Sequence, residues 1–92
     1  MPSEVFHRDV WFGGHVQGVG FRASVLHVAR AFEVTGKVGN LVDGRVFLQV
    51  EGTEREVQDF VAEVRRQLAF YIRDVEVRDF WGRPCFTDFT MR

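Results

Sequence analysis

The pair Asp43-Gly44 is the sequence feature that most limits the possible folds of this chain. Such a pair readily adopts the backbone angles of a tight turn between two strands. Apolar residues follow it at alternate positions: Val46, Leu48 and Val50. This period of two is typical of a strand with one buried face. The pattern therefore predicts a hairpin over residues 37–51, and the flanking segments must cover its apolar face.

Both flanking segments have the apolar periodicity of a helix. The residues of the first stripe are Phe21, Val25, Val28, Ala29 and Phe32. Those of the second are Val57, Phe60, Val61, Val64 and Leu68. Gly36 predicts the end of the first helical segment, because glycine often follows a helix. Thr53 and Glu56 have the spacing of a capping box and predict the start of the second helix.

Three further segments have strand character, namely 5–12, 73–80 and 86–91. The resulting order is β-α-β-β-α-β with a short extra strand. This order predicts an α+β fold, a ferredoxin-like α/β sandwich. Its antiparallel sheet of four to five strands would carry two helices on one face. With 92 residues, the chain is expected to form one domain over 1–92.

Charge and cysteine content limit the partners and the compartment. The chain has 12 basic and 13 acidic residues, without the basic stripe that nucleic-acid binding requires. It has neither the long apolar run of a signal peptide nor a membrane-spanning segment. Cys85 is the only cysteine, so the fold does not depend on an oxidising compartment. We therefore expect a cytoplasmic protein that binds neither nucleic acid nor membranes.

The loop before the first predicted helix has the character of an anion site. Gly18 and Gly20 permit unusual backbone angles and close approach of a ligand. A helix start exposes backbone N–H groups without intrahelical partners, and the helix dipole favours negative charge there. Arg22 adds a planar set of donors that matches phosphate or carboxylate. Ordinary turn chemistry and a solvated arginine are the alternative interpretation of these residues.

Asn40 is the second unusual residue, because asparagine is depleted in strands and this one lies near a strand end. As a turn residue it would bond its own backbone. As a site residue its amide could hold a water molecule, since it donates and accepts at once. The histidines His7, His15 and His27 do not have the spacing of metal ligands, so no metal site is expected.

Two stretches resemble the signatures of the acylphosphatase family. The first is GHVQGVGFR, residues 14–22, and the second is GKVGNLVDGRVFLQVEG, residues 36–52. With the order of elements, the resemblance covers almost the whole chain. It implies an enzyme that hydrolyses the carboxyl-phosphate bond of acyl phosphates, without metal or cofactor. Inorganic phosphate or sulfate is then expected as a product-like ligand.

The resemblance also implies residue roles. Arg22 would hold the phosphate and Asn40 would orient the attacking water. The phosphate-binding loop would comprise His15, Val16, Gln17, Gly18, Val19, Gly20 and Phe21, with its backbone amides on the phosphoryl oxygens. The substrate's own phosphate would accept the proton of the water. The chain departs from the family pattern at three places. Lys37 stands where the family usually has an aromatic residue, and Gly39 stands where it often has a basic or polar one. The Gly-Pro that commonly follows the second helix in the family is absent.

Two other functions are compatible with the same sequence. One is a catalytically weak domain of this kind that binds small anions or a protein partner. The other is an RNA platform, with Phe47 and Trp11 on the open face of the sheet. The second lacks the aromatic motif and the basic charge of RNA-binding sheets. Outward aromatics are better explained as covered by neighbours or as a weak dimer surface, so we expect a monomer or a weak homodimer.

Overall fold

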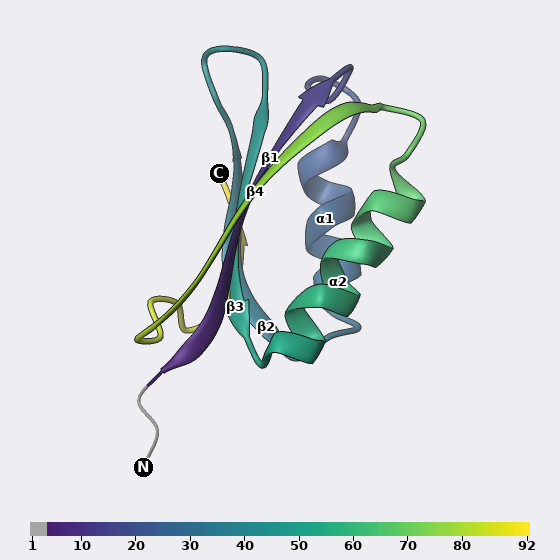
Figure 1. Cartoon of the computed structure of the whole chain (residues 1–92). Helices are drawn as coiled ribbons and strands as arrows, with labels where there is room; N and C mark the ends of the chain where they lie inside the picture. Colours follow the sequence, from purple (N-terminus) through teal and green to yellow (C-terminus); the bar gives the residue numbers. More distant parts are fainter. Residues whose placement is uncertain (1–3) are drawn as a thin grey trace.

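The computed structural model describes residues 4–92 and consists of one sheet with two helices on one face (Figure 1). The strands lie in the order β4-β1-β3-β2-β5. The elements are β1 (Val5–Gly14), α1 (Phe21–Ala29), β2 (Val34–Asn40), β3 (Val46–Gly52), α2 (Glu54–Gln67), β4 (Ile72–Gly82) and β5 (Phe89–Met91). The predicted α+β sandwich is therefore confirmed. In the described part of the chain, neither helix is long and apolar enough to cross a membrane.

The direction of β5 differs from the predicted antiparallel sheet. The strand pairs β1–β3, β1–β4 and β2–β3 are antiparallel, whereas β5 is parallel to β2. The link 83–88 carries the chain from β4 at one edge of the sheet to β5 at the other. Because this link crosses at the end where β4 finishes, β5 has to run back in the direction of β2. The sheet is mixed for this reason.

The core forms where the predicted apolar faces meet. Val10 and Phe12 of β1 and the alternating residues of β3 face the helices and are buried. Both helical stripes are buried except Phe32, which is half-buried and packs against the core. Full burial of a valine, leucine or phenylalanine side chain stabilises the fold by about 1.5–3 kcal/mol. The sequence patterns thus identified the main packing faces correctly.

The role predicted for Gly36 is wrong. Helix α1 ends earlier, at Ala29, and Gly36 lies inside β2. A Cβ atom at Gly36 would lie 2.0 Å from the carbonyl oxygen of Gln49 on β3. The glycine therefore permits close approach of two strands and does not terminate the helix.

The predicted capping box of α2 forms only in half. Thr53 is the N-cap, and its Oγ1 accepts a hydrogen bond from the Glu56 N–H at 3.2 Å. The Glu56 carboxylate instead accepts from the backbone N–H of Glu33 at 2.8 Å. It thus fixes the segment before β2 against the start of α2, because a tertiary partner competes with the local one.

The two aromatic side chains expected on the open face lie against each other. Trp11 and Phe47 are opposite one another in the β1–β3 register, and their ring centroids are 4.8 Å apart. Both are half-buried. Each ring covers part of the other, which agrees with the interpretation that neighbours cover these aromatics.

Candidate active site

The two predicted parts of the site lie at the same end of the sheet because of strand direction. Strands β1 and β2 both pair antiparallel with β3, so they run in the same direction. The loop after β1 and Asn40, the last residue of β2, therefore lie at one end of the sheet (Figure 1). Segments that are separate in the sequence form one site in this way.

The loop between β1 and α1 has the backbone geometry of an anion cradle. Gly18 and Gly20 have φ angles of 79° and 78°, in the left-handed region that glycine adopts readily. Gly20 is the N-cap of α1, makes no side-chain cap, and no acidic residue lies in the first turn. Val16 is buried and anchors the loop. Free N–H groups and the helix dipole thus favour an anion at this helix start.

A hollow of about 110 Å³ lies over this helix start. That volume is sufficient for several water molecules. It is lined by Val16, Gly18, Gly20, Phe21, Arg22, Ala23, Asn40 and Met91. The structure therefore brings Arg22 and Asn40 together with most of the predicted loop. His15, Gln17 and Val19 do not line the hollow, whereas Ala23 and Met91 do so without having been predicted.

Arg22 is the second residue of α1 and is half-buried. Its Nη1 donates a hydrogen bond to the backbone oxygen of Arg92, directly after β5. A guanidinium has five N–H donors, so this contact leaves donors for a ligand. The contact gives the side chain a defined direction beside the hollow.

Gln17 has a role that its place in the loop did not predict. Its side-chain Nε2 donates to the carbonyl oxygen of Leu41 at 2.8 Å and to that of Arg45 at 3.0 Å. Leu41 and Arg45 close the loop between β2 and β3 through a 2.8 Å backbone hydrogen bond. Gln17 therefore ties the cradle loop to the segment that directly follows Asn40.

The β2–β3 loop is also held by Asp43. The backbone N–H of Arg45 donates to its carboxylate at 3.0 Å, and the Arg45 guanidinium donates to it at 2.9 Å. These bonds, the backbone one first, hold the pKa of Asp43 below its usual value. The loop that follows Asn40 is thus fixed by its own residues as well as by Gln17.

A second, larger hollow of about 380 Å³ lies beside the first. It is lined by Lys37, Gly39, Asn40, Leu41, Phe47, Gln49 and Arg92. Asn40 lines both hollows. Lys37 and Arg92 are the charged residues of this lining, and both are basic. The second hollow can therefore receive a group attached to an anion in the first, with a preference for negative charge.

These features define a class of protein: a small α+β sandwich with a glycine-containing loop at a helix start, where anions are favoured, and an adjoining basic hollow. The family model for acylphosphatase matches residues 8–91. The chain belongs to the acylphosphatase family.

Known relatives agree with this assignment. An acylphosphatase of Archaeoglobus fulgidus is 40% identical over 72 residues, which are 76% of this chain and 80% of the relative. One of Corynebacterium glutamicum is 35% identical over 74 residues, or 77% of this chain and 79% of the relative. The crystal structure of acylphosphatase from Bacillus subtilis has a TM-score of 0.86 at 32% identity, covering 95% of this chain and 98% of that one.

Proposed function

We infer that this protein is an acylphosphatase, an enzyme that hydrolyses the carboxyl-phosphate bond of acyl phosphates to a carboxylate and inorganic phosphate. Membership of the family and the names of its relatives support this activity. In the structure, the main support for this activity is that the cradle loop, Arg22 and Asn40 line the same hollow.

In the proposed mechanism, the first hollow binds the phosphoryl group. Backbone N–H groups at the start of α1 and the Arg22 guanidinium stabilise the negative charge on its oxygens. The predicted phosphate-binding loop, residues 15–21, contributes mainly through Val16, Gly18, Gly20 and Phe21, which line the hollow. Phosphoryl transfer requires mostly positioning and charge stabilisation, and these groups supply both.

Asn40 is proposed to position the attacking water. Its side-chain amide can accept one hydrogen bond from the water and donate another. The water oxygen attacks phosphorus, the bond from phosphorus to the acyl oxygen breaks, and the carboxylate leaves. The phosphate of the substrate accepts the proton of the water. Because a carboxylate is a good leaving group, the reaction needs no strong protein base, metal ion or cofactor.

The acyl part of the substrate is proposed to lie in the second hollow. Asn40 stands between the two hollows, so a group attached to a phosphate in the first would extend into the second. Lys37 and Arg92 favour acyl groups that carry a further negative charge. In this way the Lys37 departure from the family pattern would affect substrate preference and leave the reaction class unchanged.

We further propose that the chain acts as one domain, in the cytoplasm, as a monomer or weak homodimer. The balanced charge of the chain supports the absence of a nucleic-acid partner. Inorganic phosphate and sulfate are the proposed product-like ligands. A single cysteine supports a reducing compartment.

Hydrolysis of benzoyl phosphate by the purified full chain tests the proposed function. We expect saturable turnover that exceeds the spontaneous hydrolysis of the substrate, with inorganic phosphate as a competitive inhibitor. Phosphate binding without turnover would instead indicate a catalytically weak, anion-binding domain.

A further inference from the structure

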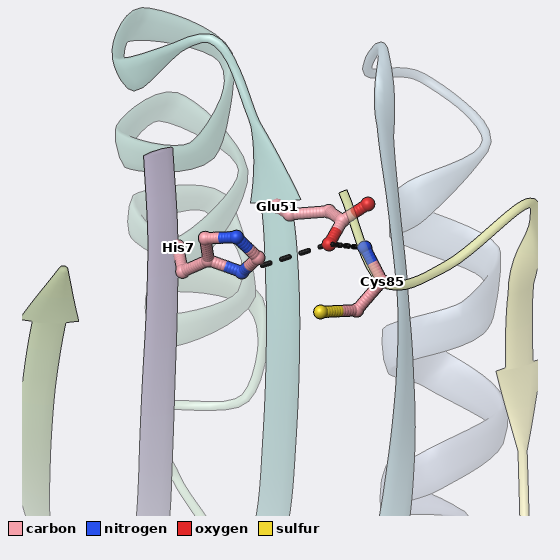
Figure 2. Close-up of side chains that lie close together, drawn as sticks. All are labelled: His7, Glu51 and Cys85. Carbon is pink, nitrogen blue, oxygen red and sulfur yellow. Dashed lines mark hydrogen bonds and ion pairs between the residues drawn. The ribbon is translucent and has the colours of Figure 1, made fainter. Parts of the chain in front are cut away.

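Three potential metal ligands converge on the open face of the sheet, away from the cradle. His7 on β1 lies opposite Glu51 on β3 in the strand register. Cys85 lies in the link 83–88 that crosses this face. One ligand atom from each of the three residues lies within 4.8 Å of the others. Figure 2 shows the His7 ring facing the Glu51 carboxylate, with Cys85 close to both.

The His7 ring is held in the orientation that a metal ligand needs. It is 4% exposed and stacks on Phe80 with 4.5 Å between the ring centroids. Its Nε2 lies 2.9 Å from the carbonyl oxygen of Arg83. Since a carbonyl oxygen only accepts, Nε2 carries the hydrogen, and Nδ1 faces Glu51 Oε1 at 3.5 Å. Histidine ligands of metal ions usually donate their other N–H to a carboxylate, a backbone carbonyl or water, and here the acceptor is a backbone carbonyl.

The Glu51 carboxylate is equally well held. It is 2% exposed and accepts hydrogen bonds from the backbone N–H groups of Cys85 at 2.7 Å and Phe86 at 3.1 Å, and from the Thr35 hydroxyl at 3.1 Å. Among residues 4–92, its only ion-pair partner is His7, which is charged only when protonated, and no lysine or arginine pairs with it. A buried carboxylate requires a compensating charge. A cation between Glu51 and His7 would supply one.

Cys85 completes the set of ligands from the solvent side. It is exposed, so an ion can reach the site and the thiol proton can leave to solvent. A tetrahedral zinc ion, with bonds of about 2.0–2.3 Å, holds its ligand atoms about 3.3–3.8 Å apart. The His7–Glu51 separation already fits this range, and rotation of the exposed Cys85 side chain would bring the sulfur closer.

We propose that His7, Glu51 and Cys85 bind one zinc ion, with water as a fourth ligand. Imidazole, thiolate and carboxylate together suit zinc better than magnesium or calcium, which prefer oxygen ligands. The ion fastens the link 83–88 to β1 and β3. The site lies about 25 Å from the cradle, because a strand rises roughly 3.3 Å per residue and β1 and its continuation lead from His7 to His15. Its role is therefore structural, and hydrolysis does not pass through it.

The test is titration of the full, untagged chain with zinc by calorimetry in metal-free buffer. We expect one equivalent of zinc to bind and to raise the Tm of the protein. Cys85→Ala removes an exposed side chain, so the fold should be retained, and should weaken binding by about 100-fold or more. His27→Gln, which removes an exposed histidine of α1, is the matched control and should bind as the wild type.

Cobalt provides a second readout, because a thiolate bound to Co²⁺ gives an intense near-ultraviolet charge-transfer band. The band should appear in the wild type and in His27→Gln and be missing in Cys85→Ala. Absence of stoichiometric zinc binding would overturn the proposal and leave a histidine–carboxylate ion pair at this position. Equal zinc affinity of the wild type and Cys85→Ala would overturn it as well.

Discussion

The side-chain amide of Gln17 donates a hydrogen bond to the carbonyl oxygen of Leu41 at 2.8 Å. This bond joins the loop after β1 to the residue that directly follows Asn40. The proposed water-positioning amide therefore has a fixed relation to the proposed phosphate cradle. A small displacement between two such groups can cost about 100-fold in rate, so the Gln17 bond is expected to matter for catalysis.

We predict that Gln17→Ala lowers kcat for benzoyl phosphate about 10- to 100-fold with a smaller change in KM. The reason is that the cradle would still bind phosphate while Asn40 loses its alignment with it. Gln58→Ala, which removes an exposed amide on α2, serves as the control in steady-state kinetics. Unchanged kcat in Gln17→Ala would show that other contacts suffice to hold Asn40.

The sequence predicted the fold well where local pattern and packing agree. The alternation of Val46, Leu48 and Val50 and the two helical stripes predicted the core because burial of one face is what orders these segments. The prediction that Gly36 ends the first helix was wrong because glycine is needed there for another reason. A Cβ atom at this position would collide with the carbonyl oxygen of Gln49 on another strand. No local pattern reports such a contact. The parallel direction of β5 depends likewise on the path of the link 83–88.

We predict that Arg22→Ala and Asn40→Ala each lower kcat/KM for benzoyl phosphate about 100- to 1,000-fold while the fold stays cooperative. Loss of one preorganised donor to a transition state typically has an effect of this size. Both side chains lie at element ends outside the core, so folding should survive. Arg30→Ala, at the other end of α1, is the control. Near wild-type kcat/KM in either site variant would refute the role given to that residue.

The geometry of the candidate site was predictable to the extent that it is local. Gly18, Gly20 and Arg22 are close in sequence, and their chemistry is that of a helix start. The Gln17 bond and the approach of Arg92 to Arg22 join distant segments, so they became apparent only in the fold. The same holds for His7, Glu51 and Cys85, which come from two strands and a link and have no motif spacing.

We predict that Lys37→Met lowers kcat/KM for succinyl phosphate relative to benzoyl phosphate by about 1.5- to fivefold. Succinyl phosphate carries an extra carboxylate, and exposed charge interactions contribute roughly 0.2–1 kcal/mol. Lys37 lines the second hollow, where that carboxylate would lie. Arg55→Met on α2, whose side chain is 87% exposed, controls for the change in net charge. An unchanged ratio would exclude Lys37 from substrate recognition.

We predict that a chelator leaves the hydrolysis rate unchanged within error. In the proposed mechanism, Arg22 and the N–H groups at the start of α1 supply the positive charge that the phosphoryl oxygens need. The proposed zinc site lies at the opposite end of β1, so its removal should lower Tm without lowering kcat. Rates with and without chelator, compared for the wild type and Cys85→Ala, test this. Loss of activity that added magnesium or zinc restores would contradict metal-independent catalysis.

Finally, inorganic phosphate should stabilise the folded protein through the first hollow, because it presents the same oxygens as the transferred group. A ligand that binds only the folded state adds about 2.7 kcal/mol at a hundredfold excess over its Kd. Phosphate should therefore raise the Tm of the wild type and inhibit competitively.

Excluded anions also stabilise proteins without a specific site, so each measurement needs Arg22→Ala at matched ionic strength. A specific effect should shrink strongly in that variant, since a charge-assisted hydrogen bond is lost. Arg30→Ala should keep the full shift, because it removes one positive charge from the same helix but none from the hollow. Equal stabilisation of the wild type and Arg22→Ala, with no competitive inhibition, would mean that the loop before α1 is a turn and not a phosphate site.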